Sequence, residues 1–270
     1  MNEPILAFDI ETIPDTALGS RLLGLEGLSE AEQMEALLQK RRQEAGGSEF
    51  MPIHLQAVLV IGMVLRTDRE LKCFSLGSRL DGERERIQRF FSGLDRLKPR
   101  LVSWNGNGFD LPVLQYRALR YAIPSAVYWE TGDRLPEFRF NHYLSRYHWR
   151  HTDLMDVLGG FQSGRNAVRL DEAARLVGLP GKLGLSGSQV LTSYLAGERE
   201  RIDRYCEVDA LTTYLLFLRL ERLRDRLTAD RFRDAVREVE DFLLAHPEPH
   251  WQEFQAHWDR SFWEASADSA

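Results

Sequence analysis

Hydrophobic and polar positions in the first half of the chain follow two different periods. Continuous or alternating apolar runs predict strands at residues 4–10, 56–66, 71–76 and 101–104. Apolar stripes at helical spacing predict helices over residues 29–42, 81–97 and 109–121. Strands mixed with helices in this order indicate an α/β fold, with a sheet of mixed polarity flanked by helices. Ligands of such sheets gather near the carboxyl ends of the strands.

The second half of the chain is mostly helical in its pattern. Residues 122–150 show little periodicity, and we expect them to form a long surface excursion. Beyond it the spacing predicts helices over residues 152–161, 170–177, 188–195, 199–227 and 229–245. We divide the chain into a main domain, 1–225, and a helical C-terminal extension, 226–270. Its end carries Trp251, Trp258 and Trp263, which favours packing on the domain, with a partner surface or dimer contact as the alternative.

Composition excludes several classes of protein. The 270 residues are 43% hydrophobic and carry a net charge of −6, which excludes collagen-like, disordered and disulfide-scaffold chains. The two cysteines, Cys73 and Cys206, form no C-x-x-C pair. The N-terminus lacks the features of a secretory leader, and no apolar run approaches the roughly 20 residues of a membrane helix. We therefore expect a cytoplasmic protein without membrane contact. Its acidic balance disfavours a broad nucleic-acid-coating surface but leaves room for a local basic groove.

Two carboxylates share one face of the first predicted strand. Because strand side chains alternate, Asp9 and Glu11 point the same way from a strand that is otherwise apolar. Desolvation and mutual repulsion oppose such a pair, and a hard divalent cation such as Mg²⁺ or Mn²⁺ would relieve both. The alternative is a strand end where the two acids meet solvent or an arginine.

Two further motifs carry acids. Asn105 and Phe109 precede Asp110 at the start of a predicted helix, and Tyr205 stands four residues before Asp209 on the longest one. Residues at i and i+4 share a helix face, so the Tyr205 hydroxyl and the Asp209 carboxylate project together. The alternatives are that Asp110 only complements the helix dipole, that Tyr205 is a core edge, and that Asp209 pairs with Arg204 or another base.

Together, D-x-E, N-x₃-F-D and Y-x₃-D resemble the three motifs of the DnaQ-like 3′–5′ exonucleases, whose fold is ribonuclease-H-like. The chain is most similar to a stand-alone bacterial family that resembles the exonuclease domain of family B DNA polymerases. Because Tyr205, four residues before Asp209, is the motif residue and Arg204 stands where a sister group has histidine, the resemblance implies the tyrosine (DEDDy) subtype.

The resemblance implies an enzyme that needs two divalent cations, Mg²⁺ or Mn²⁺, and hydrolyses single-stranded DNA from its 3′ end to nucleoside 5′-monophosphates. The resemblance also implies that the metal ligands are Asp9, Glu11, Asp110 and Asp209. Tyr205 would orient the attacking water, since its ordinary pKa near 10 makes it a poor base. Thr12, Asn105 and Phe109 would shape the pocket of the terminal nucleotide, although Phe109 as a core residue is an equal alternative. RNA as substrate, or a catalytically idle nucleic-acid-binding adaptor, are the competing functions.

A stretch of basic and aromatic residues, 138–151, suits single-stranded nucleic acid. We assign Arg146 and Arg150 to a nucleic-acid groove, with the more distant Arg165, Arg169 and Lys182 as candidates for the same groove; an ordered loop with buried aromatics is the alternative. Asp153 and Asp156 are further candidate ligands, but a helix cap is favoured at this junction, and Asp171 is expected to cap the helix that follows it.

Overall fold

The computed structural model describes residues 3–80, 82–162, 164–181 and 183–263. It is built on one five-stranded sheet in the order β3-β2-β1-β4-β5. The strands are β1 (Ile5–Pro14), β2 (Gln56–Arg66), β3 (Leu71–Leu76), β4 (Arg100–Ser103) and β5 (His151–Asp153). β1, β2 and β3 pair antiparallel, whereas β4 and β5 run parallel to β1. This mixed sheet with helices on both faces confirms the α/β, ribonuclease-H-like fold class.

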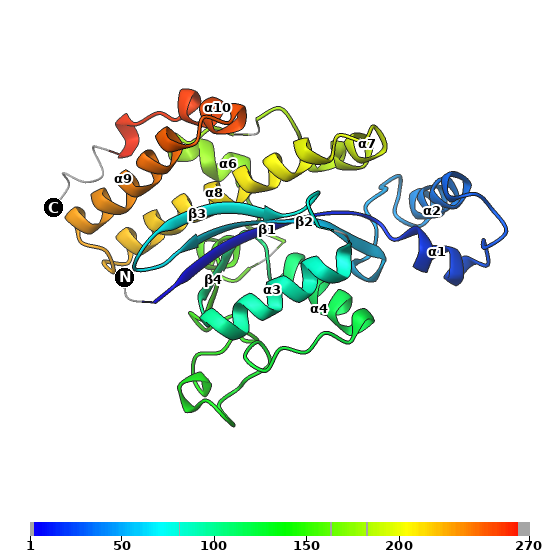
Figure 1. Cartoon of the computed structure of the whole chain (residues 1–270), viewed down its shortest axis with the longest axis horizontal. Helices are drawn as coiled ribbons and strands as arrows, with labels where there is room; N and C mark the ends of the chain where they lie inside the picture. The colour runs from blue at the N-terminus through cyan, green and yellow to red at the C-terminus, as the bar shows by residue number, and fades with distance from the viewer. Residues whose placement is uncertain (1–2, 81, 163, 182, 264–270) are drawn as a thin grey trace.

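One face of the sheet is covered by the long helix α8 (Arg199–Leu223), with α9 (Ala229–Ala245) and α10 (Pro249–His257) outside it (Figure 1). The side chains of α8 that face the sheet are apolar, and those of α9 and α10 complete the same core. Trp251, Trp258 and Trp263 are all buried in it. These three rings are therefore covered within the chain itself.

The opposite face carries α3 (Glu83–Leu97) and α4 (Asp110–Tyr121). Residues between α4 and β5 hold only one short helical turn, η2 (Pro136–Phe138). The prediction of a surface excursion is wrong for part of this segment, because Tyr128, Phe138 and Tyr143 are almost fully buried in the second core. Their rings contact one another, which keeps an irregular segment ordered without a regular period.

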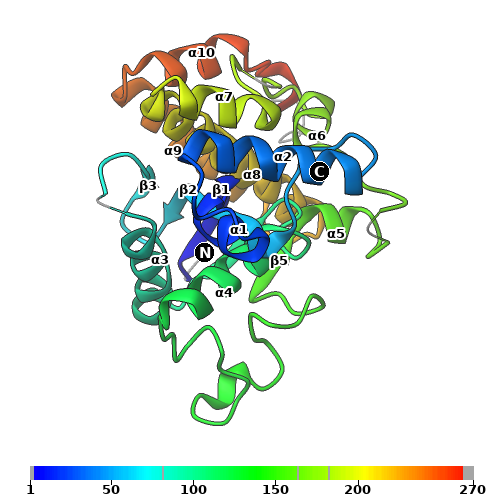
Figure 2. The same cartoon turned by 90° about the vertical axis from the view of Figure 1, so that its right-hand side faces the viewer.

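An insertion between β1 and β2 extends beyond the end of the sheet (Figures 1 and 2). It contains α1 (Thr16–Leu23), which the pattern did not predict, α2 (Glu30–Glu44) and the turn η1 (Ile53–Leu55). Ser29 and Glu32 form a capping box at the start of α2. A small core of its own, centred on Leu37, Leu38 and Met51, joins the insertion to the domain.

The remaining helices are short: α5 (Leu154–Leu158), α6 (Leu170–Leu176), α7 (Val190–Leu195) and the turn η3 (Gly187–Gln189). The predicted helix at 152–161 is corrected, because residues 151–153 form β5 beside β4, and a three-residue strand is too short to show a period. The cap assigned to Asp171 is also wrong. Arg169 is the N-cap of α6, and the Glu172 carboxylate accepts its backbone N–H.

None of the helices within the described ranges combines the length and the apolar character that crossing a bilayer requires.

Helix α8 closely approaches the sheet at Gly62 of β2, which lies opposite Asp9 in the ladder. A Cβ added at Gly62 would lie 2.3 Å from the backbone oxygen of Cys206 on α8. The Gly62 N–H also donates to the Cys206 sulfur at 3.1 Å. A glycine at this position lets a helix backbone contact a strand, which is the usual meaning of glycine inside a strand.

The variant Gly62→Ala should lower the free energy of unfolding by about 1–3 kcal/mol, because helix α8 must shift to admit the methyl group. Denaturant unfolding of the two proteins measures this change. Gly93→Ala in α3 is the matched control, since nothing lies within 4 Å of its added Cβ. An unchanged stability of Gly62→Ala would contradict the close approach of α8.

Candidate active site

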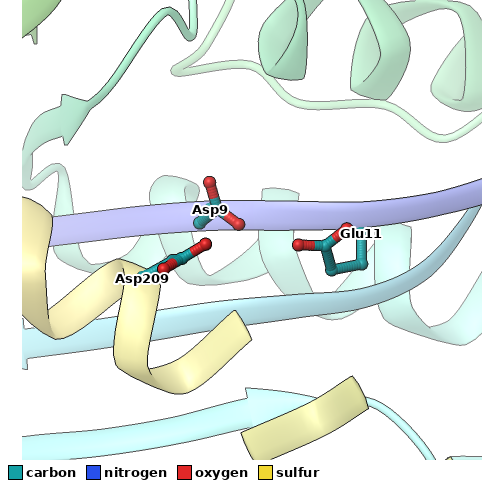
Figure 3. A group of neighbouring side chains, drawn as sticks. All are labelled: Asp9, Glu11 and Asp209. Carbon is teal, nitrogen blue, oxygen red and sulfur yellow. The ribbon is translucent and has the colours of Figure 1, made fainter. Parts of the chain in front are cut away.

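Three carboxylates from distant parts of the sequence meet where α8 crosses β1. Asp9 and Glu11 come from β1 and Asp209 from α8, and each offers an oxygen within 4.8 Å of the others (Figure 3). Both elements are fixed by packing, because α8 lies along β1 and β2. The two acids of the strand share one face, as the alternation predicted. The like charges converge because the core on either side holds their backbones in place.

Asp110 lies beside this cluster as the first residue of α4. Its side chain is buried, and one oxygen accepts the backbone N–H of Ile10, between the two acids of β1, at 3.2 Å. Burial raises the pKa of Asp110 to about 7. This hydrogen bond ties the start of α4 to the strand, so Asp110 belongs to the same pocket from the opposite face of the sheet.

Burial and the charges of all three other acids of the site raise the pKa of Asp9. Burial is the first cause that holds its pKa well above the ordinary value, followed by the charges of Asp110, Asp209 and Glu11. The Cys206 thiol opposes this shift as a hydrogen-bond donor, at 3.3 Å from the Asp9 backbone oxygen and 3.6 Å from a carboxylate oxygen. Asp9 therefore occupies the centre of the site, where a cation would contact it together with either neighbour.

Tyr205 stands one helical turn before Asp209, and its hydroxyl is hydrogen-bonded to that carboxylate. Its ring is buried against Leu59, Val60 and neighbouring apolar side chains, so it is also the core-edge residue of the alternative interpretation. Burial, and then the charge of Asp209, raise the pKa of Tyr205 far above its ordinary value. The hydroxyl keeps its proton at neutral pH and is a donor.

The turn between β4 and α4 is held by Asp153. Its carboxylate accepts the backbone N–H groups of Asn105 and Asn107, each at 2.9 Å, and that of Asp156 at 3.3 Å. The predicted role of Asp153 as a helix cap is confirmed, with the added task of shaping the turn. Asn105 adopts a left-handed backbone conformation, φ 62°, which asparagine tolerates better than most residues. This turn sets the start of α4 and hence the position of Asp110.

A groove of about 630 Å³ opens next to the acids. Glu11 and Thr12 line it from β1, Asn105 and Phe109 from the turn before α4, and Phe50 from the insertion. Phe109 also packs against the second core, so it serves both interpretations given to it. The Thr12 hydroxyl donates to the side-chain oxygen of Gln56 at 2.8 Å and thereby joins β1 to β2.

The basic residues that were expected to contact nucleic acid do not all lie in one place. Arg146 lies at the rim beyond the turn: its guanidinium contacts Asp156 at 2.7 Å, and Asp156 also accepts the Asn107 side-chain N–H. Arg150 lies at the amino end of the parallel strands, away from the acids, where it pairs with Glu3 and its side chain is 11% exposed. Lys182 lies outside the described residues.

The donor set fits a divalent cation of the hard type. Asp9, Glu11 and Asp209 supply carboxylate oxygens, the ligands that Mg²⁺ and Mn²⁺ prefer. The arginine nearest in sequence to the cluster, Arg204, pairs with Glu200 at 3.2 Å instead, so the alternative of an Arg204–Asp209 pair is not realised. Like charges buried at this distance favour a bound cation over the metal-free state.

Sequence reasoning missed several residues that build the site. Gly62 carried a usable signal, because glycine inside a strand indicates a close backbone approach. Cys206 and Gln56 carried none, since their partners Asp9 and Thr12 lie far away in the sequence. Phe50 was missed because the insertion that presents it showed no catalytic motif.

Comparison with known proteins agrees with this geometry. None of the curated proteins matches the chain. A family model described as a predicted 3′–5′ exonuclease related to the exonuclease domain of PolB matches residues 48–258. The matched segment contains the motifs of Asp110 and Asp209, while Asp9 and Glu11 precede it and join them through the fold. The chain belongs to this family of predicted 3′–5′ exonucleases related to the exonuclease domain of PolB.

Proposed function

We propose that the chain is a two-metal 3′–5′ exonuclease of the tyrosine subtype, which removes nucleoside 5′-monophosphates from the 3′ end of single-stranded DNA. The observation that carries the proposal is the convergence of four carboxylates, in which Asp9, Glu11 and Asp209 offer oxygens within 4.8 Å of one another and the charge of Asp110 also acts on Asp9. A binding module gains nothing from acids that face a phosphate backbone, so the convergence disfavours the idle adaptor.

In this proposal Asp9, Glu11, Asp110 and Asp209 would together hold the two cations. Two bound divalent ions would supply an activated water and stabilise the charge that develops on the leaving 3′ oxygen. The protein's own contribution is rigidity: β1 fixes two ligands, the Ile10 N–H fixes Asp110, and the Cys206 thiol fixes Asp9. Such preorganised ligands keep their geometry while the substrate's charge shifts.

Tyr205 contributes position rather than base strength. Its hydroxyl is a donor with a raised pKa, so it cannot take a proton from water at neutral pH. Held next to Asp209, it would instead orient the attacking water toward the phosphorus. The pair Asn105 and Phe109 would receive the terminal nucleotide in the adjoining groove.

The central experiment compares wild type with Asp9→Asn and Asp209→Asn on a 5′-labelled single strand in Mn²⁺, with DNA and RNA strands of the same sequence. Wild type should shorten the DNA from its 3′ end, and each variant should lose about 10³-fold or more in rate, because a metal site supplies several kcal/mol of transition-state stabilisation. A wild type that shortens RNA faster than DNA would support the exoribonuclease instead.

The same variants report on the cation directly. Mn²⁺ at about 100 times its dissociation constant should raise the melting temperature of wild type by roughly 5 °C or more, and that of the two variants much less. Asp225→Asn is the matched control, since its side chain is 93% exposed on the surface. Full metal-dependent trimming by Asp9→Asn would refute the proposal.

Metal-free stability should depend on pH through Asp110. Its pKa is raised to about 7 in the folded protein and is near 3.9 in the unfolded chain, so folding takes up a proton between about pH 4 and 7. The stability associated with this proton is fully present below pH 4 and is lost as the pH rises through 7. Asp110→Asn, which imitates the protonated form, should therefore gain stability relative to wild type as the pH rises from 5 to 8.

Denaturant unfolding in EDTA measures this difference at each pH. Saturating Mg²⁺ should remove most of it, because a bound cation takes over the role of the proton. A difference between Asp110→Asn and wild type that stays constant with pH would contradict the assignment.

Tyr205→Phe separates positioning from metal binding. The variant keeps the buried ring and loses the hydroxyl, so the melting-temperature rise with Mn²⁺ should remain while kcat falls by about 10²-fold. Steady-state kinetics on a short DNA strand measure the loss. An unchanged kcat would exclude the hydroxyl from the reaction.

A further inference from the structure

The insertion between β1 and β2 brings one exposed aromatic ring to the groove beside the acids. Building on the proposed function, we infer that Phe50 stacks on the base of the 3′-terminal nucleotide. Phe50 belongs to the segment that joins α2 to β2. None of the three motifs that carry the acids includes it.

Phe50 and Phe109 form one aromatic wall of the groove. Their ring centroids lie 5.3 Å apart at an angle of 46°, and both rings line the groove that Glu11 enters. Phe109 is partly covered by the core, whereas 59% of Phe50 is exposed. An exposed phenyl ring beside a polar groove has an open π-face, which is what a nucleobase requires for stacking.

The backbone of Phe50 is fixed although its ring is open. The Arg41 side chain donates to the Phe50 carbonyl oxygen at 2.6 Å, and the next residue, Met51, is buried. The Met51 carbonyl accepts the side-chain N–H of Gln56 at 2.8 Å, and Gln56 in turn accepts the Thr12 hydroxyl. Thr12 follows Glu11 on β1, so these bonds set the position of the ring relative to the acids.

The other groove residues indicate the kind of ligand. Arg169 lines the groove with a side chain that is 66% exposed; its Nε lies 3.5 Å from a carboxylate oxygen of Asp171, and a guanidinium at this place suits a phosphate. The groove also contains Glu49, whose charge is paired with Arg42. Aromatic faces, a cation and a carboxylate cluster for metal together match a nucleotide at the end of a strand.

The volume of the groove suits a ligand of the size of a single nucleotide. About 630 Å³ lies within the range of roughly 300–1,000 Å³ found for pockets that bind small molecules. A groove of this volume accommodates one base stacked on Phe50. Stacking also tolerates any base, since each has a π-face, so we expect little sequence preference.

The test uses the full chain with Phe50→Ala, the aromatic replacement Phe50→Tyr, and Leu22→Ala as a control. Leu22 is on the same insertion, is also 59% exposed, and does not line the groove. On single-stranded DNA, Phe50→Ala should lower kcat/KM by about 5- to 150-fold, the range that corresponds to one lost base stack. Phe50→Tyr should retain most of the activity, and Leu22→Ala all of it.

A strand whose last nucleotide is abasic identifies the contact. If Phe50 stacks on the terminal base, wild type should lose as much on the abasic end as Phe50→Ala loses on the normal one, and the variant should lose nothing further on the abasic end. If Phe50→Ala lowers kcat/KM by the same factor on the abasic end as on the normal end, the inference is overturned. Full activity of Phe50→Ala on normal DNA would also overturn it.

A binding measurement keeps this inference separate from the proposed function. In the Asp209→Asn background, fluorescence anisotropy of a 5′-labelled strand should show the same 5- to 150-fold weakening when Phe50→Ala is added. If Phe50→Ala weakens DNA binding but the wild-type protein cleaves no DNA, the base contact is supported and the nuclease activity is refuted. Cleavage by wild type without any effect of Phe50 would refute the base contact alone, and no binding at all would refute both.

Discussion

Repulsion among buried carboxylates is the constraint on which the architecture of this protein depends. Asp9 lies next to Asp110, Asp209 and Glu11 in a setting that raises its pKa well above the ordinary value. Such a group is tolerated only if the surrounding structure fixes the backbones that carry it. The apolar face of α8 meets this requirement, because each fully buried aliphatic or aromatic side chain contributes about 1.5–3 kcal/mol. The core thereby offsets a local cost that a bound cation would remove.

Both faces of the sheet contribute to the site, and each uses a different device. On one face, Gly62 admits the backbone of Cys206, so that α8 delivers Tyr205 and Asp209 directly above β1. On the other face, Asp153 holds the turn before α4, and Asp110 reaches back to the N–H of Ile10. The first arrangement depends on the absence of a side chain at Gly62. The second depends on the buried Asp153 carboxylate, which accepts hydrogen bonds from the turn. Losing either would move one ligand while leaving the strand itself intact.

The sequence allowed the sheet and its acids to be predicted because both follow short-range rules. Alternation along β1 placed Asp9 and Glu11 on one face, and helical spacing placed Tyr205 beside Asp209. β5 was not predicted, because it has only three residues and is recognised as a strand by its pairing with β4. The exposed helix α1 and the buried aromatics of residues 122–150 escaped it too, because neither follows a single period over enough residues.

Long-range contacts explain the rest of what could not be predicted. The thiol of Cys206 meets Asp9 across 197 positions, and Gln56 meets Thr12 across 44, so no local pattern announces either pair. Arg150 illustrates the opposite error: its basic and aromatic neighbourhood suggested a nucleic-acid contact, but the fold places it at the amino end of the parallel strands beside Glu3. Composition indicates which chemistry is available, while topology decides at which edge of the sheet it appears.

The position of the insertion gives the active-site strand two separate roles. β1 carries Asp9 and Glu11 and continues through Thr12 into the bonds that fix Met51 and Phe50. The acids lie where β1 pairs with β2, beyond its pairing with β4, whereas the groove wall belongs to an insertion with its own small core. Changes in the insertion would therefore alter how a strand end is held without disturbing the carboxylates. Under the proposed function, this separation would let the groove wall change while the carboxylate cluster stays in place.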